Sequence, residues 1–441
     1  MKNLSLLHFP TFIGGIILLG LIAVPTFAQD TDKIEELQRV IDVQQKQMET
    51  QQKQLDAQKQ LLQDLQKQME SLVKETKTVV QTPAPAAQSS YHSPIADHEN
   101  IVTTTAEERV KLSISGWVNR AVNIVDDGKD TDAYFVDNDN AESRVNFAGT
   151  AKVTDDLSLG GMIELTIAPN KASNVNQEHQ ETGDIFEERI VEATFDSKRF
   201  GKLSLGKGFS AAYGSGSRDL SRTTVIAYST IADTAGGMLF RQKDDDTLTN
   251  LQINEAFQTF DGLSRVNRVR YDTPTYYGFS LSAAAISDQR YDAALYWGGQ
   301  GYGFKAIGGV GLAYPNKDDT GLQYDGSFSL LHEHTGLNLT LSAGMQERDN
   351  QADAQHFYVK LGWLKRFFSF GETAFAVDYF RSPNQPTEND DGYSFGAAVV
   401  QLFEEYGTEL YFLYRLHSLD RDVEPKVHNI NVVSIGARVK F

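Results

Sequence analysis

The sequence predicts an all-β transmembrane protein, a 16-stranded antiparallel outer-membrane β-barrel preceded by an α-helical coiled coil. Three observations support this fold class. Apolar and polar residues alternate over most of residues 110–441, short and long connections take turns between the alternating segments, and a heptad repeat precedes them. A transmembrane barrel is polar on its inner face, so the low overall hydropathy of the chain is compatible with it.

Composition excludes several classes of protein. The 441 residues carry a formal charge of −18 and no cysteine. The acidic balance argues against a nucleic-acid partner, and the missing cysteine excludes disulfides and thiolate metal sites. The usual hydrolase, metalloprotease and phosphate-loop motifs are absent, and His332 and His334 are too exposed at a hairpin end to favour a metal site. We therefore expect no catalytic residue, no cofactor and no metal, and hence no enzyme.

Residues 1–28 have the layout of a secretory signal peptide. Lys2 precedes an apolar stretch over residues 12–24, and Thr26-Phe27-Ala28 places small residues at the −3 and −1 positions. The alternative, an uncleaved anchor, needs about 20 apolar residues, and this stretch is shorter. We expect cleavage before Gln29.

Residues 29–80 predict a coiled coil that lies in the periplasm. Neither Gly nor Pro occurs from residue 30 to residue 80, and a seven-residue step falls on apolar residues throughout. These are Ile34, Ile41, Met48, Leu55, Leu62 and Met69. The second seam contains Gln44, Gln51 and Gln58, which leaves a Gln-rich disordered tail as the alternative. Residues 81–109 are a Pro/Ala/Ser-rich linker.

Residues 110–441 predict sixteen strands of alternating polarity. We place them at 110–123, 143–154, 157–167, 184–195, 202–209, 265–272, 278–286, 291–298, 302–313, 323–333, 337–347, 355–364, 367–381, 391–403, 407–417 and 428–441. Short turns such as 154–156 alternate with longer acidic connections such as 126–142, as in outer-membrane barrels. Arginines and lysines recur on the polar face deep within strands, which suits a water-filled lumen rather than a soluble sandwich.

Several motifs in this region resemble the general trimeric porins of Gram-negative bacteria. The clearest is Asn267-Arg268-Val269-Arg270-Tyr271-Asp272-Thr273-Pro274 followed by Gly278-Phe279, and Phe200-Gly201-Lys202-Leu203 is another. The terminal Phe441 is similar to the signal that the barrel-assembly machinery reads in this class. The preceding coiled coil resembles the DcaP-like porins. The resemblance implies a homotrimer and a third loop, about residues 210–263, that folds into the barrel.

In this family the inner wall and the third loop carry the charges that select solutes. The residues that we expect to line or narrow the pore are Arg144, Glu188, Glu192, Lys207, Arg218, Arg222, Arg241, Arg268, Arg270, Arg415, Arg438 and Lys440. Cations facing carboxylates in a narrow pore would produce a transverse field. The alternative for any one arginine is that it pairs with a neighbouring carboxylate and sets loop conformation.

The sequence thus favours an outer-membrane porin, a passive channel for small hydrophilic solutes with a preference for acidic ones such as dicarboxylates. A non-selective or phosphate-type porin is the first alternative. A barrel-anchored structural tether between the outer membrane and peptidoglycan is the second. Acidic loops near Asp126 and Asp130 are expected to lie beside outer-membrane lipid and lipopolysaccharide.

Overall fold

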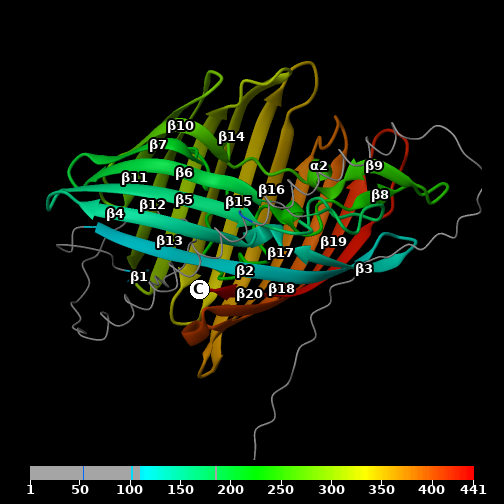
Figure 1. Ribbon diagram of the computed structural model, residues 1–441. Helices are drawn as coiled ribbons and strands as arrows, with labels where there is room; N and C mark the ends of the chain where they lie inside the picture. Colours follow the sequence, from blue (N-terminus) through cyan, green and yellow to red (C-terminus); the bar gives the residue numbers. More distant parts are fainter. Residues whose placement is uncertain (1–52, 54–100, 103–109, 184–185) are drawn as a thin grey trace, which may run out of the picture. The chain divides into compact units, whose positions relative to one another are not determined.

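The computed structural model describes residues 53, 101–102, 110–183 and 186–441 (Figure 1). Apart from Lys53 and β1 (Ile101–Val102), the predicted signal peptide, coiled coil and linker lie outside the described residues. In the part of the chain that is described, no helix has the length and apolar character that a membrane span requires.

Sixteen antiparallel strands close into a barrel, which confirms the predicted strand number. Each strand pairs with the next along the barrel, and the last pairs with the first over Trp117–Asp126 and Asn431–Lys440. The strands are β2 (Val110–Asp126), β4 (Arg144–Lys152), β5 (Leu157–Ile167), β6 (Phe186–Ser197), β7 (Gly201–Phe209), β10 (Arg265–Asp272), β11 (Phe279–Ile286), β12 (Arg290–Gly301), β13 (Phe304–Tyr314), β14 (Thr320–His332), β15 (Leu337–Arg348), β16 (Ala354–Phe368), β17 (Gly371–Pro383), β18 (Asp391–Phe403), β19 (Thr408–Asp420) and β20 (Ile430–Lys440).

Three local expectations need correction. The acidic connection after β2 is not a plain loop, because β3 (Thr131–Asp137) folds back and pairs with the end of β2. The connections 287–289 and 315–319 are short although they lie at the end of the barrel that carries the long loops. Residues 365–368, assigned partly to the following strand, complete β16, and the turn is at 369–370. We call the two ends of the barrel the loop end and the turn end.

The alternation of side chains separates a lipid-facing wall from a lumen. On β10, Val269 and Tyr271 are exposed on the outer face, whereas Arg268 and Arg270 are buried on the inner face. Successive side chains of a strand point to opposite faces. Each strand therefore presents its apolar residues to the lipid and its polar residues to the lumen.

The third loop, residues 210–264, folds into the lumen and forms an apolar core with one side of the barrel. It contains η3 (Ile231–Asp233), β8 (Leu239–Arg241), β9 (Leu248–Gln252) and α2 (Ile253–Ala256). Figure 1 shows β8, β9 and α2 beside β19 and β3. Buried loop residues pack with buried inner-face residues of β16–β20, among them Ile226, Met238, Phe240, Phe257, Phe380, Leu413 and Val432. The third loop therefore fills the lumen beside β16–β20.

Polar anchors fix the part of the third loop that reaches deepest towards the turn end. Lys360 of β16 is fully buried, and its Nζ contacts an Asp219 carboxylate oxygen, Thr223 Oγ1 at 3.1 Å and Ala227 O at 2.9 Å. Ser327 and Ser329 of β14 accept hydrogen bonds from the backbone of the same segment, from Arg218 N at 2.8 Å and Leu220 N at 3.0 Å.

At the loop end, the β8–β9 hairpin is tied to two other loops. Arg241 Nη2 lies 2.7 Å from Asp127 Oδ2 and 3.3 Å from Asp130 Oδ2. The backbone of Lys243 donates to Lys426 O at 2.9 Å, and His428 N donates to Arg241 O at 2.8 Å. The third loop is thus held at its deep tip and at its outer hairpin.

We predict that Lys360→Met loosens the third loop while the barrel persists. The substitution leaves the buried Asp219 without its counter-ion, a change that costs about 3–5 kcal/mol in other proteins. Amide hydrogen exchange should rise over residues 218–228, and heat-modifiable mobility on gels should stay that of a folded barrel. Lys365→Met, on the exposed outer side of the same strand, is the matched control. Unchanged exchange in Lys360→Met would contradict this anchoring role.

Candidate functional site in the lumen

A group of charged side chains lies on the inner face of β4–β6 and in the loops beside it. We call Glu142, Arg144, Glu164, Lys171 and Arg189 the arginine cluster. Glu164 Oε1 accepts hydrogen bonds from Arg189 Nε at 2.7 Å and from Arg144 Nη1 at 3.2 Å. Glu142 contacts Lys171 Nζ at 2.5 Å and also pairs with Arg189.

Two loop carboxyl groups lie beside the arginine cluster in a weakly hydrated environment. Burial raises the pKa of Asp139 to about 7, against the opposing charge of Lys171. Burial also raises the pKa of Asp233 to about 6, although the hydroxyl of Tyr228 donates to this carboxylate and the charges of Lys171, Arg265 and Arg189 oppose the shift. Each negative Asp raises the pKa of its neighbours, and Asp233 does so for Asp139. These two groups therefore titrate near neutral pH.

A row of cations continues from the arginine cluster towards the turn end. Arg144, Trp117 and Lys440 are register partners across β4, β2 and β20. The guanidinium carbon of Arg144 lies 4.5 Å from the Trp117 ring centroid, and that of Arg438 lies 5.5 Å from it. Guanidinium groups at this distance from an indole face are attracted to its quadrupole. We call Arg144, Trp117, Arg438 and Lys440 the cation row.

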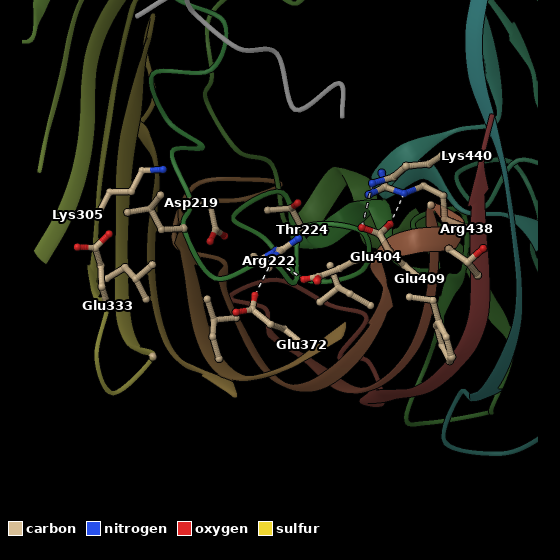
Figure 2. Close-up of a pocket in the computed structure, with 18 residues that line it drawn as sticks. Asp219, Arg222, Thr224, Lys305, Glu333, Glu372, Glu404, Glu409, Arg438 and Lys440 are labelled. Atoms are coloured by element: carbon tan, nitrogen blue, oxygen red, sulfur yellow. Dashed lines mark hydrogen bonds and ion pairs between the residues drawn. The ribbon is translucent and has the colours of Figure 1, made fainter. Parts of the chain in front are cut away.

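The cation row ends in a cavity of about 720 Å³ at the turn end, under the deep tip of the third loop (Figure 2). We call this cavity the vestibule. Arg222 lies at its centre with a left-handed backbone, φ 60°, and bridges to Glu372 at 2.6 Å and Glu404 at 3.4 Å. Lys305 and Glu333 line one side and Arg438 and Lys440 the other, as Figure 2 shows.

Arg268 and Arg270 face the lumen as expected, and both hold the start of the third loop. Arg268 Nη2 lies 2.5 Å from Glu192 Oε2, and its Nε donates to Phe209 O at 2.9 Å. Arg270 pairs with Asp272 at 2.7 Å and donates to Ser210 O at 2.8 Å. These contacts correspond to the alternative reading, in which an arginine sets loop conformation.

Three other expected pore residues are held by contacts with the wall or with other loops. Arg415 is fully buried against Asp378, with two bonds of 2.8 and 3.0 Å, on the side of the barrel that the third loop covers. Arg241 lies in the loop network at the loop end, paired with Asp127. The guanidinium of Arg218 lies over the Tyr296 ring, 4.3 Å from its centroid.

Lys207 and Glu188 lie on the outer face, contrary to expectation. Lys207 is in register with Val191 and Asn267 and shares the parity of the exposed Leu205, whereas Glu192 and Arg268 occupy the opposite face. Glu188, 63% exposed, pairs with Lys207 at 3.3 Å. The reason is a bulge in β6: pairing with β5 passes from Ile190 directly to Glu188, so Arg189 is inserted and the parity changes.

The bulge also explains why Arg189 was missed. With Glu188 and Glu192 assigned to the lumen by simple alternation, Arg189 falls on the lipid side. The loop residues Lys171, Glu142 and Asp233 were missed because periodicity in the sequence does not predict the conformation of a loop. Phe441 closes the barrel: its N donates to Gly116 O at 3.0 Å, and its O accepts from Gly116 N at 2.8 Å.

Comparison with known proteins agrees with this architecture. A family model of Gram-negative porins matches residues 80–422. An anion-selective porin from Comamonas acidovorans aligns with 75% of this chain and 100% of its own, at 14% identity and a TM-score of 0.51. OmpT of Vibrio cholerae, in a trimer form, aligns with 76% of this chain and 100% of its own, at 14% identity and a TM-score of 0.50.

The outer membrane channel DcaP of Acinetobacter baumannii aligns with 77% of this chain and 99% of its own, at 13% identity and a TM-score of 0.50. At these identities the structures bear on the fold alone. No curated protein sequence matches the chain significantly. The family match covers most of the chain and agrees with the closed 16-stranded barrel and its inward third loop. The chain belongs to the Gram-negative porin family, whose members are outer-membrane channels for solutes.

Proposed function

We propose that this porin is a homotrimeric, water-filled diffusion channel for small hydrophilic solutes, with a preference for acidic solutes such as dicarboxylates. The observation that carries the preference is the charge of the arginine cluster. Three cations, Arg144, Arg189 and Lys171, face two carboxylates, Glu142 and Glu164, so one positive charge is in excess.

The adjoining carboxyl groups oppose this preference, and they do so less as the pH falls. Asp139 and Asp233 would reverse the excess if both were ionised, but their raised pKa values keep part of each population protonated. A narrow lumen with low-dielectric walls increases the effect of a single charge on a passing ion. On this count the arginine cluster and its two neighbours are close to neutral at pH 7 and become positive as the pH falls.

A second candidate is a non-selective or phosphate-type porin. The loop end favours a channel without anion preference, because the carboxylates of Asp126, Asp130 and Asp132 and the run Asp244-Asp245-Asp246 lie there. Negative charge at the mouth attracts cations and opposes the arginine cluster. A measurement of ion selectivity would show whether the acidic loop end or the arginine cluster dominates.

The outer wall of β2, β4 and β5 supports the proposed trimer. Gly149 and Gly161 face each other in register on this wall, and open space surrounds the position of a Cβ at Gly149. Most of the neighbouring outward side chains are aliphatic, such as Ile114 and Ile163, with Phe147 the aromatic exception. Small and aliphatic side chains allow a second copy of the barrel to approach closely.

A structural tether is the remaining alternative. It depends on the predicted periplasmic coiled coil and on an interaction with peptidoglycan, both of which concern residues outside the described part. Recognition of Phe441 by the barrel-assembly machinery, and contact of the acidic loops with lipopolysaccharide, likewise remain proposals that follow from the family.

Single-channel recording in a planar bilayer tests the proposed function directly. Unheated protein purified in detergent should close in three equal steps, and a salt gradient should give an anion-selective reversal potential. Three steps with cation selectivity would keep the trimeric channel and remove the preference for acidic solutes. A folded barrel without conductance would favour the tether.

We predict that anion selectivity rises as the pH falls from 8 to 5. Asp139 gains its proton near pH 7 and Asp233 near pH 6, so two negative charges leave the constriction and its net charge becomes more positive. The reversal potential should therefore shift towards the anion value over this range. Asp233→Asn should make the total shift smaller, and a flat profile in the unaltered protein would contradict the assignment.

Glu164→Gln should also increase anion selectivity, at constant pH. The substitution removes the carboxylate that Arg144 and Arg189 share. One unit charge a few ångströms away in water is worth about 1 kcal/mol, which corresponds to about a fivefold change in the anion-to-cation permeability ratio. Glu347→Gln is the matched control, because Glu347 bonds Tyr324 on the outer face. An equal effect of both variants on selectivity would show that the arginine cluster is not the selective part of the channel.

A further inference from the structure

The vestibule has its own excess of positive charge, confined to β20. Arg438 Nε lies 2.5 Å from Glu409 Oε2, and Lys440 Nζ lies 3.2 Å from Glu409 Oε1, so two cations share one carboxylate. Glu409 is mostly buried, whereas Lys440 is part-exposed and faces the cavity.

The other charges of the vestibule balance. Arg222 is shared by Glu372 and Glu404, and Arg366 reaches Glu404 from outside the cavity at 2.5 Å. Asp219 is neutralised by the buried Lys360. Lys305 and Glu333 contribute one charge of each sign on the far side. The cavity as a whole therefore has room for one additional negative charge, beside Arg438 and Lys440.

Apolar side chains adjoin this charged patch. Leu402 of β18 is the register partner of Glu409, which is in turn the partner of Arg438, so the three lie in one row on the inner face. Leu220, Leu331 and Leu364 line the same cavity. A solute whose anionic group contacts β20 would place the rest of its body against leucines.

We propose that the vestibule is a second solute site, for a monoanionic carboxylate with an apolar body. Arg438 and Lys440 hold the carboxylate, and Leu402 with Leu220 contacts the hydrocarbon part. A dianion fits less well, because its second charge would meet Glu372, Glu404 or Glu333 on the remaining lining. The proposal deepens the proposed function, since it assumes that solutes reach the vestibule through the channel.

The cation row connects this site to the constriction. Trp117 separates Arg144 from Lys440 in the register, and both Arg144 and Arg438 lie over its ring. A carboxylate that leaves the arginine cluster thus meets Arg438 and Lys440 next, with only the Trp117 side chain between the two sites. Weak sites in succession permit passage, because each binds well enough to admit the ion and too weakly to retain it.

Solute-induced current fluctuations test the proposal in the intact channel. Pentanoate, glutarate and acetate are added in turn, on each side, to single trimers of the full chain. We expect pentanoate to interrupt the current at least threefold longer than acetate, which lacks the apolar body, and longer than glutarate, which carries a second charge. Glutarate residence equal to or longer than that of pentanoate would overturn the assignment to monoanions.

Two variants locate the site. Lys440→Gln should shorten pentanoate residence at least threefold, whereas Lys305→Gln, the matched change on the opposite side of the vestibule, should leave it unchanged. Leu220→Ala should shorten residence for pentanoate and leave acetate unaffected. Equal effects of the two lysine variants, or none, would overturn the proposal.

Different results would contradict the proposed function and the vestibule site. Loss of anion selectivity or of conductance in the unaltered protein would remove the proposed function. Normal anion-selective conductance with no dependence of pentanoate residence on Lys440 would remove the vestibule site alone. Three-step closure of each variant shows that its trimer has folded.

Discussion

Apolar packing of the third loop against the inner wall determines the course of the lumen. A barrel of sixteen strands encloses more space than its own side chains fill, and here a loop supplies a hydrophobic core on one side of that space. Ile226, Phe240 and Phe257 bury their side chains against β16–β20, as in the interior of a soluble domain. The space that is left in the lumen thus depends on where the loop finds an apolar partner.

Buried charges in the lumen occur mainly as paired sets, and the small imbalances between the sets carry the chemistry. Removing an ion from water is expensive unless a counter-ion and hydrogen bonds replace the hydration shell. Arg415 with Asp378 and Lys360 with Asp219 satisfy this condition and hold structure. Glu164 and Glu409 each accept two cations, so each leaves one positive charge uncompensated. In the function proposed above, selectivity depends on a difference of one charge between neighbouring groups.

The strand pattern was predictable because parity repeats over many residues. The sixteen strands, the inner positions of Arg268 and Arg438 and the outer position of Val269 all follow from alternation. The parity of Leu203 and Leu205 also places Lys207 on the outer face, which differs from the lumen position expected for it. The inserted residue Arg189 could not be read in this way, because a bulge leaves no mark on composition. Loop contributions such as Lys171 and Asp233 depend on tertiary packing, which alternation does not encode.

Closure of the barrel joins the two ends of the described sheet. Trp117 belongs to its first long strand and Lys440 to its last, and they become neighbours only when β20 pairs with β2. Contacts so distant in sequence form late, because the loop-closure entropy must be met before they contribute. An unclosed barrel would therefore possess the arginine cluster, whose members lie on β4, β5 and β6 and in the loops beside them, but it would lack the complete cation row. The pairing of β20 with β2 that closes the wall thus also brings the members of the cation row together.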